Sequence, residues 1–129
     1  MYLLTATHTN ERPIMSLTIS PLAPVAPAYV QVNIGRNVGM GPLSPAQWAA
    51  FQAEVVDALR NATIGRGVIS THTGRGAWQD DNGNTVSEDS AYFSTFAVVD
   101  VPALRGALRT VKNRFEQDAI ALIVGSELI

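Results

Sequence analysis

The stretch from Thr63 to Val99, TIGRGVISTHTGRGAWQDDNGNTVSEDSAYFSTFAVV, contains the densest run of strand-forming residues in the chain. Within it, Asp81-Asn82-Gly83-Asn84 is a turn signal, because Asn-Gly supplies the positive φ that a tight connection needs. The stretch therefore predicts a strand from Thr63 to Trp78, a hairpin turn, and a strand from about Ala91 to Val99. This last strand is apolar on both parities, which is typical of a strand covered on both faces.

Working outward, alternating residues predict a strand over Ala28 to Ile34. A helix follows from Ser44 to about Arg60, with Ser44 as its N-cap in a capping box. A second helix is expected from Asp100 to near Asp118, and a last strand from Ala119 to Val124. The order strand, helix, strand, strand, helix, strand predicts a ferredoxin-like α+β fold, a four-stranded antiparallel sheet with both helices on one face.

Length and composition point to one domain. At 129 residues and 47% hydrophobic content, the chain can bury one ordinary core. Pro21, Pro24 and Pro27 recur every third residue, which favours an extended segment. We therefore expect an N-terminal arm over residues 1–27, with Met15 as an alternative start, and a single domain over residues 28–129.

Charge and residue usage exclude several classes of function. The formal net charge of -2 argues against a nucleic-acid partner, because such proteins usually carry a basic excess. The absence of cysteine excludes disulfides, thiolate nucleophiles and cysteine-ligated zinc. No apolar run approaches the roughly 20 residues that span a bilayer, and the N-terminus lacks the pattern of a secretory signal. We expect a soluble, cytoplasmic protein with no membrane partner.

The predicted arrangement leaves one sheet face without helices. That face would expose either Tyr92 or Phe93, with the residues of the same parity, as a larger apolar patch than monomers usually leave in water. Pairing two such faces would bury the patch. The sequence therefore predicts a homodimer through the open sheet face, of the dimeric α+β-barrel type.

Three segments carry a resemblance to a known family: LSPAQWAAFQAEVV, GRGAWQDDNGNTVSEDS and RFEQDAIAL. Together they resemble a family of small bacterial proteins known only as a domain of unknown function, over roughly Ile34 to the C-terminus. The resemblance implies a ferredoxin-like fold and implies no chemistry.

Few side chains are candidates for catalysis. A histidine can exchange a proton near neutral pH, so His72 is a candidate general base if it faces a cleft; otherwise it is an ordinary strand histidine. Glu88 and Asp89 are adjacent and point to opposite faces of a strand, so they cannot act as a carboxylate pair; either could pair with Arg75. No metal site is expected, because His8 lies in the arm, far along the chain from His72.

The glycine-rich segment 35–41 precedes a capped helix and could bind an anion with the help of Arg36, or could serve only as a flexible turn.

Three functions remain open. The first is a small-ligand-binding or regulatory dimer with no cofactor, whose pocket lies between helices and sheet or between paired sheets. Its lining would be drawn from Asn33, Arg36, His72, Arg75, Trp78 and Tyr92. The second resembles the cofactor-independent monooxygenases and isomerases of the dimeric α+β-barrel class, with His72 as base and Asn33 or Arg75 steadying an enolate-like oxygen. The third is an interaction or inhibitor protein without a small-molecule site.

Overall fold

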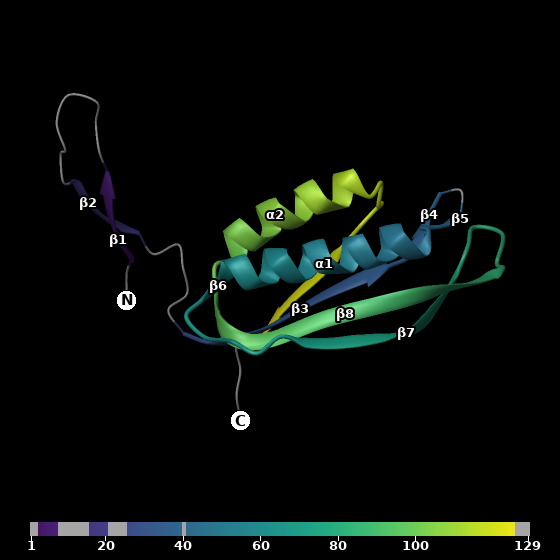
Figure 1. Cartoon of the computed structure of the whole chain (residues 1–129), viewed down its shortest axis with the longest axis horizontal. Coiled ribbons are helices and arrows are strands. Elements are labelled where there is room, and N and C mark those ends of the chain that lie inside the picture. Colours follow the sequence, from purple (N-terminus) through teal and green to yellow (C-terminus); the bar gives the residue numbers. More distant parts are fainter. Residues whose placement is uncertain (1–2, 8–15, 21–25, 40, 126–129) are drawn as a thin grey trace.

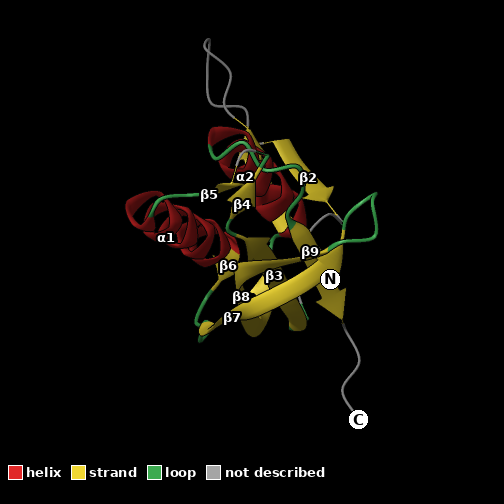
Figure 2. Cartoon of the chain, turned by 90° about the vertical axis from the view of Figure 1, so that its right-hand side faces the viewer, coloured by secondary structure: helices red, strands yellow, loops and turns green. Residues whose placement is uncertain are grey.

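The computed structural model describes residues 3–7, 16–20, 26–39 and 41–125. Two helices lie on one face of an antiparallel sheet, which makes an α+β fold of two layers (Figures 1 and 2). The elements are β1 (Leu3–Thr7), β2 (Ser16–Ser20), β3 (Ala28–Gly35), β4 (Asn37–Val38), β5 (Gly41–Pro42), α1 (Pro45–Ala62), β6 (Thr63–Ile64), β7 (Ser70–Gln79), β8 (Thr85–Val99), α2 (Val101–Arg114) and β9 (Ala121–Gly125).

The main sheet has five strands. β3 lies between β9 and β8, and the other edge of β8 is shared by β6 and β7, with every pairing antiparallel. If β6 and β7 are counted as one interrupted strand, this is the strand order of the ferredoxin-like arrangement. The predicted α+β fold is therefore confirmed.

Several predicted boundaries are wrong. The strand expected from Thr63 to Trp78 is interrupted over residues 65–69, where Gly65 has a φ of +81° that a strand cannot continue. β8 begins at Thr85, six positions before the expected Ala91. α2 ends at Arg114, before the expected Asp118, because Glu116 adopts a φ of +54° and turns the chain toward β9.

The helix starts follow the local sequence signals. Ser44 Oγ accepts a hydrogen bond from the backbone N of Gln47 at 3.2 Å, and Gln47 Oε1 accepts one from the backbone N of Ser44 at 3.0 Å. This is the predicted capping box. At the second helix, Asp100 Oδ1 accepts from the backbone N of Ala103 at 3.1 Å.

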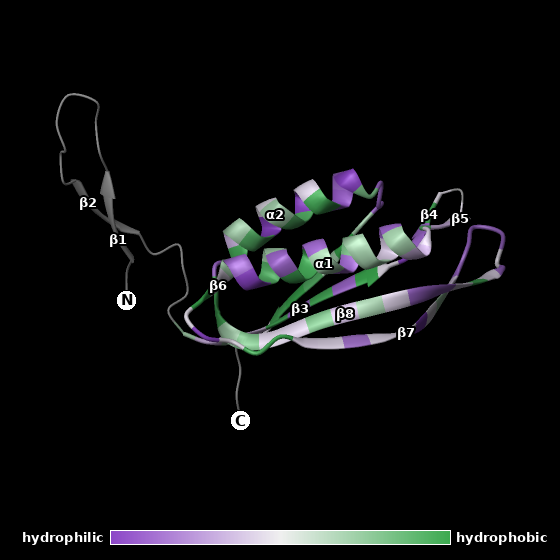
Figure 3. Cartoon of the chain, in the orientation of Figure 1, coloured by the Kyte–Doolittle hydropathy of each residue, from purple (hydrophilic) through white to green (hydrophobic). Residues whose placement is uncertain are grey.

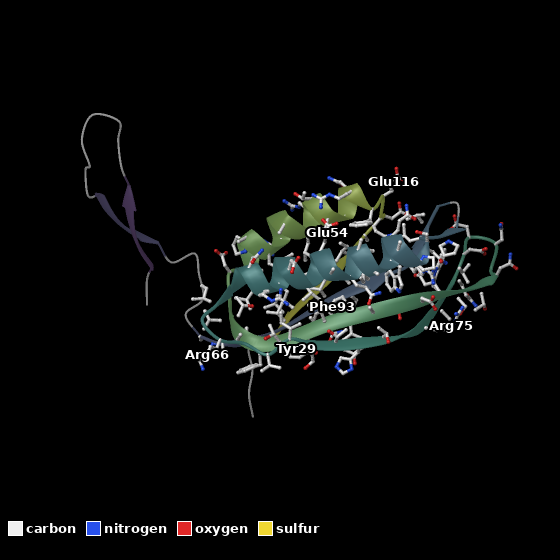
Figure 4. The ribbon with its side chains drawn as sticks, viewed as in Figure 1. Tyr29, Glu54, Arg66, Arg75, Phe93 and Glu116 are labelled. Atoms are coloured by element: carbon white, nitrogen blue, oxygen red, sulfur yellow. The ribbon has the colours of Figure 1, made fainter. Side chains whose placement is uncertain are left out.

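The core lies between the helices and the sheet, where apolar segments face one another (Figure 3). Phe51 of α1 is fully buried, and its ring stacks on Phe115 at 5.0 Å between centroids. Phe93 of β8 points toward the helices and is 1% exposed, whereas its neighbour Tyr92 is 37% exposed on the opposite face (Figure 4 labels Phe93). The open face is therefore the one that carries Tyr92, and the helix-covered face is the one that carries Phe93.

In the N-terminal part, β1 and β2 pair with each other as a separate two-stranded sheet. Pro21 and Pro24, which suggested an extended arm, lie outside the described residues. Among the helices that the structure describes, none is long and apolar enough to cross a membrane.

Candidate functional site

The candidate site is a cavity of about 470 Å³ at the end of the sheet, called here the sheet-end cavity. Three segments form its walls: the chain leaving β3, the hairpin end of β7 and β8, and the connection from α2 to β9. The lining residues used below are Gly35, Asn37, Trp78, Asp80, Glu88, Glu116, Gln117 and Asp118. Residues that are distant in the sequence meet here because neighbouring strands of the sheet are not consecutive in the sequence.

Glu88 is positioned by the chain that leaves β3. Its Oε2 accepts a hydrogen bond from the backbone N of Asn37 at 2.9 Å. The carboxylate lies directly over Gly35, where a Cβ would come within 2.6 Å of Glu88 Oε1. A glycine at position 35 therefore lets this carboxylate form part of the cavity wall.

Asp89 lies on the opposite side of β8 from Glu88 and stabilises the same region through two ion pairs. Arg36 Nη1 lies 2.8 Å from Asp89 Oδ2, and Arg75 Nη1 lies 3.1 Å from Asp89 Oδ1. Arg36 also donates from Nε to the carbonyl oxygen of Leu43 at 2.7 Å. Both arginines are predicted ligand-binding residues, but in the structure both form ion pairs with Asp89. These ion pairs hold β7 and the glycine-rich segment against β8. The predicted pairing of Arg75 with a carboxylate of the hairpin is therefore confirmed.

The sheet-end cavity is acidic. Asp80, Glu88, Glu116 and Asp118 all line it, and within the described ranges none of these carboxylates is ion-paired with a cationic side chain. Asp80 Oδ1 accepts from the backbone N atoms of Asn82 and Asn84, both at 2.9 Å, so part of its role is to shape the hairpin turn. The carboxylates are not gathered closely enough to bind a metal in the part of the chain that the structure describes.

Trp78 adds an apolar surface to this acidic cavity. Its side chain is 50% exposed although it belongs to a strand of the main sheet. An exposed indole face beside carboxylates can bind a cationic group both through its π system and through charge attraction. A small molecule that carries a positive charge next to a flat or apolar part would match this arrangement.

Three other predicted site residues lie elsewhere, on the open sheet face. Asn33, Tyr92 and His72 are directly opposite one another on β3, β8 and β7. The His72 ring stacks on Tyr92, with 4.4 Å between centroids and 15° between planes. None of the three lines the sheet-end cavity. In this structure the His72 row and Trp78 occupy different places on the sheet, and the predicted pocket that combines these residues with Arg36, Arg75 and Trp78 stays a prediction.

The open face also carries a hydrogen-bonded row along β3. Tyr29 donates from its hydroxyl to Gln31 Oε1 at 2.6 Å, and Gln31 donates from Nε2 to Asn33 Oδ1 at 2.7 Å. Beside this row, Tyr29 is opposite Phe96 of β8, which is 44% exposed. Three polar side chains here are linked by two hydrogen bonds, next to exposed aromatic rings.

Sequence reasoning missed most of the cavity lining. From the sequence, Glu88 is expected at most to pair with Arg75, and residues 116–118 are expected to end a helix. The available signals were Gly35, a glycine at the end of a predicted strand, and the adjacent acidic residues of the hairpin. Neither signal shows that the two segments, 51 positions apart, meet.

Comparison with known proteins supports the fold. No family model matches the chain, and no curated protein matches it. Among solved structures, a phage SAM lyase in complex with S-methyl-5'-thioadenosine is similar at 14% identity, over 81% of this chain and 84% of that one, with a TM-score of 0.53. A DUF3240 family protein from Shewanella baltica OS155 is similar at 12% identity over 79% and 91%, with a TM-score of 0.45. Bacillus subtilis GlnK in complex with ATP is similar at 14% identity over 79% and 85%, with a TM-score of 0.39.

The first of these likenesses shows a shared fold, and the TM-scores of the other two are too low to support an argument. The chain is a small α+β protein whose fold is similar to that of the phage SAM lyase. Membership of the family that the sequence resembles stays a prediction, since no family model matches.

Proposed function

We propose that this protein is a small-ligand-binding module whose ligand occupies the sheet-end cavity. The observation that carries the proposal is the cavity itself, whose volume of about 470 Å³ falls within the range of about 300–1,000 Å³ that is typical of ligand sites. Its walls are held by the Glu88 contact to Asn37 and by the two arginines on Asp89. A site that is largely formed before binding loses less conformational entropy when the ligand enters.

The lining favours a cationic ligand. Unpaired carboxylates create a negative potential, and the half-exposed indole of Trp78 provides a face for a charged or flat group. S-methyl-5'-thioadenosine is a reasonable first probe, because a phage SAM lyase of this fold is in complex with it. Its sulfur is neutral, so a cationic sulfonium such as S-adenosylmethionine should bind this chain more tightly.

Native mass spectrometry of the protein from its own source would show whether it carries a small molecule. Binding can then be measured by the fluorescence of Trp78 in a Trp48→Phe background, where a ligand in the cavity should change the emission. Glu88→Gln should weaken binding by about 10- to 150-fold, since a charge-assisted contact contributes about 1.5–3 kcal/mol. Asp57→Asn, which removes the same charge from the outer surface of α1, should leave affinity unchanged. A protein that carries no ligand and shows no response of Trp78 to either probe contradicts the proposal.

The protein is also proposed to act as a homodimer through its open sheet faces. Tyr29, Tyr92, Phe96 and Ile123 are each between 37% and 46% exposed on this face. Because Tyr29, Gln31 and Asn33 already hydrogen-bond one another, removing them from water costs less than burying unpaired polar groups. An exposed apolar face whose polar side chains are partly hydrogen-bonded to one another is suited to an isologous interface.

A further inference from the structure

A second feature adjoins the sheet-end cavity, shares Asp118 with it, and lies between α2 and the edge strand β9. It is a groove of about 300 Å³, called here the α2–β9 groove. Three basic residues of α2 line one side, and apolar residues form the floor: Arg105, Arg109 and Lys112, with Leu108, Ile120 and Leu122. The basic residues are spaced four and three positions apart, so they form one stripe along the helix.

The charge of the α2–β9 groove is opposite to that of the whole chain. Its three cations outnumber its one carboxylate, Asp118, by two, while the chain has a net charge of -2. In the part of the chain that the structure describes, neither Arg105, Arg109 nor Lys112 forms an ion pair. An anionic partner would therefore bind here without displacing an internal salt bridge.

The groove runs beside a free strand edge. β9 is the outermost strand of the main sheet and pairs only with β3 among the described elements. An unpaired edge presents backbone N–H and C=O groups that can accept a further strand. Leu122 points toward the groove, whereas Ile123, opposite Gln31, lies on the open face and is 46% exposed.

We propose that the α2–β9 groove binds an extended acidic segment of a partner protein, which adds to the sheet as a strand beside β9. Side chains of a strand alternate between the two faces. The residues of the segment that face α2 would be acidic and meet the basic stripe, and the residues between them would be apolar and continue the open face beside Ile123. Backbone hydrogen bonds would supply affinity and the alternation would supply specificity.

A second copy of this chain fits the α2–β9 groove less well. Pairing β9 with β9 of another copy would bring two α2 helices to the same edge, and each carries the same unpaired basic residues. Like charges across an interface disfavour that pairing. Charge complementarity therefore selects an acidic partner.

The test starts from a phage-displayed library of random eight-residue peptides, selected on the full chain. We expect enriched peptides with acidic residues at alternating positions. A synthetic enriched peptide, followed by fluorescence anisotropy, should bind Arg109→Glu at least about tenfold more weakly. Arg66→Glu makes the same change of charge on the β6–β7 connection, at the opposite edge of the sheet, and should bind normally (Figure 4). Lys112→Gln gives a milder second test if Arg109→Glu shows an altered thermal unfolding curve.

Backbone pairing is tested with the same peptide N-methylated at alternate residues, in the two possible phases. One of the two phases should lose binding, because its N–H groups facing β9 are removed. Enrichment of peptides without acidic residues overturns the proposal, as does equal weakening by Arg109→Glu and Arg66→Glu. Full binding by both methylated peptides also overturns it and identifies a contact made by charge alone. Self-association of the chain that is lost in Arg109→Glu would assign the groove to a second copy instead.

Discussion

Replacing Phe96 tests the proposed dimer most directly. Phe96 is 44% exposed on the open face, and burying a whole phenylalanine side chain contributes about 1.5–3 kcal/mol. Covering the exposed fraction is therefore expected to contribute about 1 kcal/mol in each chain. In an isologous interface the residue is buried twice, which gives about 2 kcal/mol for the dimer. Phe96→Ala should then raise the dimer dissociation constant by about 30-fold.

Phe96→Lys should have a larger effect, because it places an unpaired ammonium group in the interface at a cost of several kcal/mol. Sedimentation equilibrium would measure the dissociation constant of each variant. Ala53→Lys adds the same charge to an exposed position of α1 and should leave the dimer intact. A wild-type chain that sediments as a monomer at high concentration would refute the reasoning, and so would a dimer that tolerates Phe96→Lys.

Three further substitutions test the site and the fold. Gly35→Ala should displace the Glu88 carboxylate and weaken ligand binding in the Trp78 fluorescence assay, while the free energy of unfolding changes by less than about 1 kcal/mol. Unchanged affinity would show that Glu88 does not contact the ligand. Asp100→Ala removes the N-cap acceptor of α2 and should cost about 1 kcal/mol in urea unfolding, with Asp100→Asn close to wild type; a stability loss in both variants would contradict the capping role. Phe51→Ala should cost about 3–5 kcal/mol by the same measurement, because the ring is fully buried; a cost below about 1 kcal/mol would contradict its place in the core.

The parts of the fold that local sequence signals determine were predictable. Ser44 and Gln47 are three positions apart, so their capping box forms within one helical turn. The alternation over Ala28 to Ile34 likewise predicts the buried and open sides of β3, and the register confirms it. In β8 both parities are apolar, so only the packing of the helices could decide that Phe93 is buried and Tyr92 is open.

The candidate site could not be predicted because it depends on long-range geometry and on where α2 ends. The sequence predicts a helix to near Asp118, yet the chain leaves the helix after Arg114 and turns at Glu116. That turn brings Gln117 and Asp118 to the sheet-end cavity instead of extending α2. A positive φ at a glutamate has no sequence signature comparable to that of glycine.

The position of His72 bears on the choice between a binding protein and an enzyme. A general base must reach the proton that it removes and is usually oriented by a further polar group. His72 instead stacks flat on Tyr92, and within the described residues no carboxylate hydrogen-bonds to it. It lies in the same cross-strand row as Asn33, on the face proposed to be buried between two chains. The carboxylates and the exposed indole lie at the other site, the sheet-end cavity. The geometry therefore favours the proposed ligand binding in that cavity, and in the proposed dimer His72 would be covered by the partner chain.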